Sequence, residues 1–108
     1  MHILQYLDTI GRNPFAVWFD GLDPQAAAKV TIAVARLEQG NFSNTKGVGG
    51  GVLEYRIDFG PGYRVYFGRD GEEIIILLGG GTKKRQRQDI ETAHARWNDY
   101  RRRRNEGR

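Results

Sequence analysis

The side chains best suited to chemistry lie in two short stretches, one near the middle of the chain and one at the start of its last quarter. They are Glu54, Arg56, Arg64, Tyr66, Lys83 and Lys84. Arginine stays charged and binds two phosphate oxygens with its planar guanidinium, while glutamate, tyrosine or a lysine of lowered pKa can transfer a proton. These residue types suit cleavage of RNA by its own 2′-hydroxyl, because that reaction needs an oriented nucleotide, a neutralised phosphate and proton transfer.

Other kinds of catalytic site are poorly supported. His2 and His94 are the only histidines and lack the spacing of metal ligands, and the chain has no cysteine. Ser43 is the only serine and lies outside any Gly-x-Ser-x-Gly motif. The glycine runs at 47–51 and 79–81 lack the spacing of dinucleotide-binding and P-loop motifs. We therefore expect catalysis with no metal and no cofactor.

Charge is distributed unevenly along the chain. Residues 1–82 carry 7 basic and 9 acidic side chains, whereas residues 83–108 carry 10 basic and 4 acidic ones, within a net charge of +4. A basic segment on a near-neutral body favours a polyanionic partner such as nucleic acid. The basic residues expected to bind RNA are Arg85, Arg87, Arg101, Arg102, Arg103 and Arg104. The alternative for the last four is a solvated helix end whose cations complement the helix dipole.

One α+β domain must position these residues, because 108 residues suffice for one compact domain but hardly for two. The sequence predicts a strand at 2–7, a short helix starting at Asn13-Pro14, and a helix from Asp23-Pro24 to about Gln39. A C-terminal helix is expected over about 86–104. Its inner face is predicted to consist of Ile90, Ala93, Trp97 and Tyr100.

Between the helices, alternating apolar residues predict a meander of three antiparallel strands over 53–59, 63–67 and 72–78. The apolar run of the third strand indicates burial on both of its faces. Asp70-Gly71 indicates a tight hairpin turn, which would place Ile75 and Leu77 on the polar face of the sheet, beneath the C-terminal helix.

The polar face depends on how the first two strands pair. If Phe59 lies opposite Tyr63, Asp58 lies opposite Arg64, and Arg56 opposite Tyr66. The basic start of the last helix would then lie beside Arg64 and Tyr66. An ion pair between Asp58 and Arg64, with Tyr66 stacked on Arg56, is a purely structural explanation of the same residues.

The compartment is predicted from what the sequence lacks. The longest apolar run, at 74–78, is too short to cross a bilayer. The N-terminus does not show the basic-then-apolar order of a signal peptide, and a chain without cysteine suits a reducing cytosol. We expect a cytoplasmic protein that does not enter a membrane.

Three segments carry a family resemblance: 51–57, 60–67 with its Gly-Pro-Gly-Tyr-Arg-Val-Tyr-Phe string, and 77–84, followed by Gln86 and residues 89–93. Over nearly its whole length the sequence resembles the phage-derived addiction-module killer proteins of the RelE/ParE superfamily, a group of HigB-like toxins. The resemblance implies a single RelE-like domain over 1–108, composed of an N-terminal strand, two helices, an antiparallel meander and a C-terminal helix. It further implies a type II toxin that cleaves mRNA on the ribosome and a cognate antitoxin, usually with a helix-turn-helix domain.

The superfamily leaves a second function open. ParE-like toxins share the fold but inhibit DNA gyrase by binding and perform no RNA chemistry, so fold alone does not decide between the two. The presence of Arg56, Arg64, Tyr66 and the lysine pair favours the nuclease.

The sequence also departs from the family pattern. Tyr55 stands where leucine is usual, and Thr82 stands where aspartate is usual, which removes an acid beside Lys83. Some relatives use a histidine near the C-terminus as general acid. Here His94 lies inside the last helix near Trp97, which favours a packing role and leaves the identities of the acid and base open.

Overall fold

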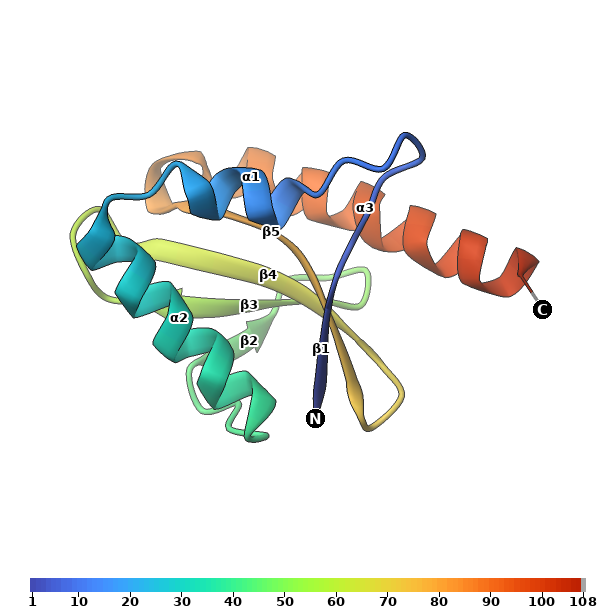
Figure 1. Ribbon diagram of the computed structural model, residues 1–108, viewed down its shortest axis with the longest axis horizontal. Coiled ribbons are helices and arrows are strands. Elements are labelled where there is room, and N and C mark those ends of the chain that lie inside the picture. Colours follow the sequence, from blue (N-terminus) through green and yellow to red (C-terminus); the bar gives the residue numbers. More distant parts are fainter. Residues whose placement is uncertain (108) are drawn as a thin grey trace.

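A computed structural model describes residues 1–107 of the chain (Figure 1). Its elements in order are β1 (His2–Gln5), α1 (Pro14–Asp20), α2 (Pro24–Glu38), β2 (Thr45–Gly47), β3 (Val52–Ile57), β4 (Tyr63–Asp70), β5 (Ile74–Thr82), the 3₁₀ turn η1 (Lys83–Arg85) and α3 (Gln86–Glu106). The strands form one sheet in the order β1-β5-β4-β3-β2. The pairing of β1 with β5 is parallel, and the other three pairings are antiparallel.

The first two helices begin where the sequence predicts. Asn13 Oδ1 accepts a hydrogen bond from the Ala16 amide at 3.0 Å, and Asp23 Oδ1 accepts one from the Ala26 amide at 2.9 Å. Each helix has proline in its first turn, where no backbone donor is needed. Gly40, at φ 80°, follows the end of α2 and lets the chain turn away.

Helices cover both faces of the sheet (Figure 1). Helices α1 and α2 pack on one face, over a core that includes Phe15, Val30, Leu37, Val65 and Phe67. Helix α3 packs on the other face, over Tyr6, Val52, Ile76, Leu78 and Trp97. The predicted inner face of α3 is confirmed, because Ala93 and Trp97 are buried and Ile90 and Tyr100 pack against this second core.

The pairing of β3 with β4 differs from the prediction. Ile57, not Phe59, lies opposite Tyr63, so the connection is a five-residue loop, 58–62. Because the shift is two residues, every side chain keeps its predicted face, but the cross-strand partners change. Arg64 lies opposite Arg56, and the predicted pairing of Asp58 with Arg64 is wrong.

The β4–β5 hairpin also differs. Asp70 pairs with Ile74, so the turn holds three residues, 71–73, and Arg69 lies opposite Ile75, where a two-residue turn would place Glu72; β5 is therefore displaced by three residues from the expected register. A displacement by an odd number of residues reverses the face of every side chain. Ile75 and Leu77 therefore lie in the α1–α2 core, and the prediction that they lie beneath α3 is wrong; Ile76 and Leu78 occupy that place.

Three features of the sheet were not predicted. Strand β2 adds a short edge, β1 ends at Gln5 and pairs with β5 in parallel, and β5 continues through its glycines to Thr82. The glycines in β5 allow close approach of the helices. A Cβ at Gly80 would lie 2.3 Å from the Trp18 ring of α1, and one at Gly81 would lie 1.9 Å from the Asp89 carboxylate of α3.

Candidate active site

The centre of the candidate site is a buried polar trio on the α3 side of the sheet. Glu54 in β3 lies directly opposite Tyr66 in β4. Arg64 is two residues before Tyr66 in the same strand, so its side chain lies on the same face of the sheet. The side chains are 0% exposed for Glu54, 2% for Arg64 and 1% for Tyr66. Strand alternation thus brings three predicted catalytic residues together, beneath the start of α3.

The hydrogen bonds of the trio are incomplete. Glu54 Oε2 accepts a hydrogen bond from Gln86 Nε2 at 2.8 Å, and Arg64 Nη1 donates one to the Tyr63 carbonyl at 3.1 Å. Arg64 Nε lies 3.6 Å from Glu54 Oε1, within ion-pair range. Among the described residues, Glu54 Oε1, Arg64 Nε and Tyr66 Oη have no hydrogen-bond partner. Buried polar atoms are almost always satisfied, so three such atoms side by side mark a candidate for ligand chemistry.

The environment of Tyr66 sets its protonation state. Burial raises the pKa of Tyr66 well above its usual value, and the neighbouring Glu54 and Asp89 carboxylates raise it further. Tyr66 is consequently a neutral phenol at physiological pH. Its hydroxyl can give a proton to a reacting oxygen but is unsuited to accept one.

The predicted lysines lie at the surface next to the trio. Lys83 and Lys84 form η1 with Arg85, and all three side chains are exposed. The Lys83 amide donates a hydrogen bond of 2.8 Å to the Gly62 carbonyl, which joins η1 to the loop before β4. Gly62 has φ 79°, and a Cβ there would lie 3.5 Å from both Lys83 Cβ and Arg64 Nη1. The backbone thus brings Lys83 and Arg64 to one end of the sheet.

Other predicted residues lie farther from the trio. Arg56 is opposite Arg64 in the backbone, but its exposed side chain borders a separate hollow of about 550 Å³, shared with Lys29 and Arg36 of α2. Arg85 donates two hydrogen bonds to Gln88, at 3.2 and 3.0 Å, and Arg87 is exposed on the first turn of α3.

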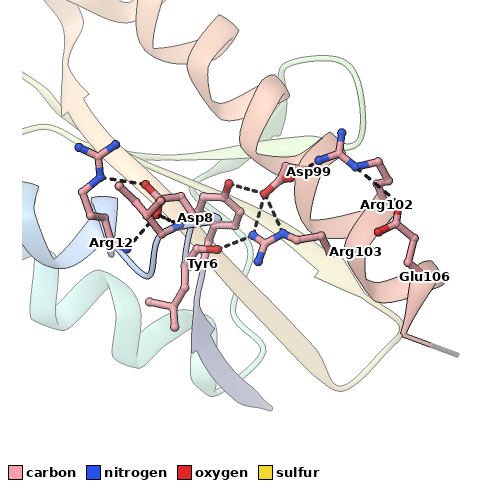
Figure 2. A network of polar contacts seen from close by, with 9 residues as sticks. Tyr6, Asp8, Arg12, Asp99, Arg102, Arg103 and Glu106 are labelled. Atoms are coloured by element: carbon pink, nitrogen blue, oxygen red, sulfur yellow. Dashed lines mark hydrogen bonds and ion pairs between the residues drawn. The ribbon is translucent and has the colours of Figure 1, made fainter.

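Three of the four arginines at 101–104 have acidic partners within the chain. Figure 2 shows those of Arg102 and Arg103. Arg102 lies 2.5 Å from Asp99 and 3.9 Å from Glu106, and Arg103 lies 2.7 Å from Asp99 and also donates to the Leu7 carbonyl. Arg104 Nε lies 2.5 Å from Asp70 Oδ2. The predicted role of the four arginines in RNA binding stays a prediction. The contacts of Arg102 lie within α3, whereas those of Arg103 with Leu7 and of Arg104 with Asp70 join α3 to other parts of the chain.

Asp99 is the centre of that fastening. Tyr6, at the end of β1, donates a hydrogen bond of 2.6 Å to Asp99 Oδ2, and Arg103 donates to the same oxygen at 3.0 and 2.7 Å (Figure 2). The Tyr6 hydrogen bond is the main cause that lowers the pKa of Asp99. At the far side of the helix, Tyr100 donates a hydrogen bond of 2.7 Å to Asp70. Tyr6, which follows β1, and Asp70, the last residue of β4, therefore hold the second half of α3.

Sequence reasoning missed a cavity of about 710 Å³ between α1 and α3. Its floor is Gly79 and Gly80 of β5, and Tyr66 forms part of its inner wall. Its charged residues are Asp8, Arg12, Arg85, Asp89 and Arg96. Asp89 lies in a segment of the family resemblance, but only the packing of α3 over Gly81 shows that its carboxylate faces the sheet.

No metal-binding cluster of three or more histidine, cysteine or acidic residues occurs within residues 1–107. His94 is engaged elsewhere, because its Nε2 lies 3.0 Å from the Val48 carbonyl and its ring packs on Gly50. Of the helices in the described part of the chain, none is long and apolar enough to cross a membrane.

The fold and the trio define a RelE-like α+β protein with a polar cluster under its C-terminal helix. Comparison with known proteins agrees. The model of the phage-derived Gp49-like protein family (DUF891) matches residues 17–98, and the chain belongs to this family, a relative of the type II toxins of the RelE/ParE superfamily. An uncharacterized protein of Haemophilus influenzae is 42% identical over 80 residues, which cover 73% of this chain and 81% of that protein.

Proposed function

We propose that the chain is the toxin of a type II toxin–antitoxin system and acts as a metal-independent, ribosome-dependent mRNA endonuclease. The observation that carries this proposal is the buried trio with three unsatisfied polar atoms. A glutamate, an arginine and a neutral tyrosine can supply the base, the cation and the acid that RNA cleavage by the 2′-hydroxyl requires. Membership of the Gp49-like family supports the toxin assignment.

Each member of the trio has a role in the proposed reaction. The 2′-hydroxyl oxygen attacks the adjacent phosphorus and passes its proton to Glu54. The bond from phosphorus to the 5′-oxygen breaks, and that oxygen takes the proton of the Tyr66 hydroxyl. Arg64 neutralises the charge that builds on the phosphate oxygens. The products are a 2′,3′-cyclic phosphate and a 5′-hydroxyl.

In the proposed reaction, the exposed basic side chains near the trio attract and position the RNA backbone. Lys83 and Lys84 lie at the end of the sheet where Arg64 is buried, and Arg85 and Arg87 continue the positive charge into the first turn of α3. Such contacts to phosphates position a nucleic acid without reading its sequence. They would hold the RNA backbone over the trio.

The reaction requires a local opening, because a side chain that is 2% exposed cannot contact a phosphate. The cover consists of η1 and the first turn of α3, and the Gln86–Glu54 hydrogen bond is its direct link to the trio. We propose that RNA binding displaces this short segment. The later turns of α3, held by Asp99 and Tyr100, would stay in place.

In the cell this function implies a cytoplasmic protein held inactive by a cognate antitoxin, with mRNA on the ribosome as target. The burial of Glu54, Arg64 and Tyr66 also favours a second candidate, a ParE-like toxin that inhibits DNA gyrase by binding, since binding alone needs no exposed catalytic group.

Induction of the chain in cells, followed by mapping of new 5′ ends on mRNA, tests the proposal. We expect new ends within translated regions in the wild type and none in Arg64→Met at equal protein level. Growth arrest without new mRNA ends, together with inhibition of supercoiling by purified gyrase, would reject the nuclease in favour of the gyrase inhibitor.

A further inference from the structure

The cavity between α1 and α3 has the size and shape of a ligand site. It measures about 710 Å³, within the range of small-molecule pockets. Glycines form its floor, and Trp18 of α1 lines one wall while Thr92, Ala95 and Arg96 of α3 line the other. Residues at its edge, such as Val17 at 71% exposure, are open to solvent. Tyr66, whose hydroxyl is buried and has no hydrogen-bond partner among the described residues, is one of its lining residues.

The cavity is lined by both hydrogen-bond donors and hydrogen-bond acceptors. Asp8 and Arg12 satisfy each other through an ion pair of 3.1 Å. Arg96 uses Nη1 to donate to the Leu78 carbonyl at 2.9 Å, which fixes its guanidinium against the floor. Asp89 lies near Arg85 and Arg96, whose charges favour its ionised form, while burial opposes it. The cavity thus presents a carboxylate acceptor and guanidinium donors next to an aromatic wall.

This combination selects a nucleobase over a bare phosphate. A phosphate would meet the arginines but be repelled by the Asp89 carboxylate, whereas a base offers donors and acceptors on different edges of one plane. Guanine presents adjacent N1–H and N2–H donors on one edge, which match a carboxylate, and O6 and N7 acceptors on another, which match an arginine. Aromatic residues such as Trp18 are the usual stacking partners of unpaired bases.

We propose that this cavity binds an unpaired guanine base of RNA, with Asp89 and Arg96 as the residues that determine specificity. The inference rests on the proposed function for its choice of RNA, since a free guanine nucleotide has the same base. Because Tyr66 belongs both to the cavity and to the trio, a base in the cavity would fix the register of the adjoining phosphate relative to Arg64.

Titration of the ¹⁵N-labelled full chain tests the inference without any cleavage. The probes are RNA pentamers with one central guanine, adenine, cytosine or uracil, in which deoxyribose at the central nucleotide removes the attacking hydroxyl, and guanosine 5′-monophosphate. We expect the Trp18 indole N–H signal to shift, while that of Trp97, outside the cavity, stays in place. The guanine pentamer should bind about 5- to 140-fold more tightly than the others, which corresponds to 1–3 kcal/mol for one bidentate contact.

Three variants on α3 make the test specific. Asp89→Asn keeps the shape of the side chain and should remove the preference for guanine. Ala95→Trp fills the cavity from an exposed position and should block the Trp18 shift. Glu91→Gln is the matched control, because Glu91 is an exposed acid of the same helix outside the cavity, and it should bind as the wild type does.

The outcomes separate the inference from the proposed function. Equal affinity for the four pentamers, or a preference that survives Asp89→Asn, would overturn the guanine site even if the chain cleaves mRNA. Tight binding of guanosine monophosphate with no binding of the guanine pentamer would make the ligand a free nucleotide and overturn the RNA assignment. Guanine-specific pentamer binding by a chain that cleaves no mRNA would sustain the site and reject the nuclease.

Discussion

Arg64 and Glu54 form an ion pair without a hydrogen bond: Nε lies 3.6 Å from Oε1, and both side chains are buried in the sheet under α3. Removal of one charge from such a pair costs about 3–5 kcal/mol, because the other charge is left alone in the interior, whereas replacement of both by apolar residues is often neutral. The structural and the chemical contributions of Arg64 are therefore separable.

We expect Arg64→Met alone to lower the free energy of unfolding by about 3 kcal/mol or more and to remove toxicity. The double variant Arg64→Met, Glu54→Met should regain most of that stability and remain non-toxic. Urea unfolding and growth after induction measure the two effects. A double variant that is as stable as the wild type and still toxic would limit the pair to a structural role.

RNA cleavage should proceed without a metal ion. With the 2′-hydroxyl as nucleophile, we expect products that carry 2′,3′-cyclic or 3′-phosphates and 5′-hydroxyls, formed in excess EDTA wherever the ribosomes of the assay tolerate it. End-group analysis of the fragments measures this. A strict magnesium requirement on a short RNA without ribosomes, with 5′-phosphates on the products, would contradict the roles given to Glu54 and Tyr66.

The arginines at 101–104 should differ in their contributions. Arg101 is exposed and has no acidic partner among the described residues, so Arg101→Gln should leave the melting temperature unchanged and reduce the salt dependence of ribosome binding by about one unit of log–log slope. Arg103→Gln and Arg104→Gln should each lower the melting temperature slightly, since each breaks contacts that hold α3. The same melting temperature for all three variants would show that the ion pairs of α3 contribute nothing.

The ionised carboxylate of Asp89 should lower the free energy of unfolding at neutral pH. Burial raises the pKa of its carboxyl, so the folded state binds the proton more tightly than the unfolded state does. Proton binding to Asp89 therefore stabilises the folded state. This stabilisation is complete below the ordinary pKa of 3.8 and is lost as the pH rises through the raised pKa of the folded state. Asp89→Asn should therefore melt at a higher temperature than the wild type at neutral pH, and the difference should vanish below pH 3.8. A melting temperature of Asp89→Asn below that of the wild type at neutral pH would contradict the expectation that the buried carboxylate destabilises the fold.

Patterns of neighbouring residues predicted the helices well, because helix caps and amphipathic spacing depend on residues that are close in the sequence. The caps at Asn13 and Asp23 and the apolar spacing in the last helix depend only on nearby residues. The register of the hairpins was not predictable in the same way. Asp70-Gly71 favours a two-residue turn, but packing of Ile76 and Leu78 under α3 requires the three-residue turn that the structure shows. Long-range packing determined the register there.

The sequence predicted which residues form the site, but not that they are buried. Strand alternation predicts that Glu54, Arg64 and Tyr66 share a face, and a two-residue error in register does not change it. The sequence also predicted that the start of the last helix lies beside Arg64 and Tyr66, but not that it buries them, since the hydrogen bond from Gln86 to Glu54 joins residues 32 positions apart. The cavity was missed for the same reason, because its walls come from α1 and α3.

The parallel pairing of β1 with β5 has a consequence for synthesis of the chain. Residues 2–5 are translated before residues 74–77, with which they pair, and Tyr6 can contact Asp99 only later still. At about 5–20 residues per second the nascent chain spends several seconds without its edge strand. During that time neither the cover over the trio nor the sheet beneath it is complete. If the chain is the toxin that we propose, a nascent chain should be inactive until translation has passed α3, which gives an antitoxin an interval in which to bind it.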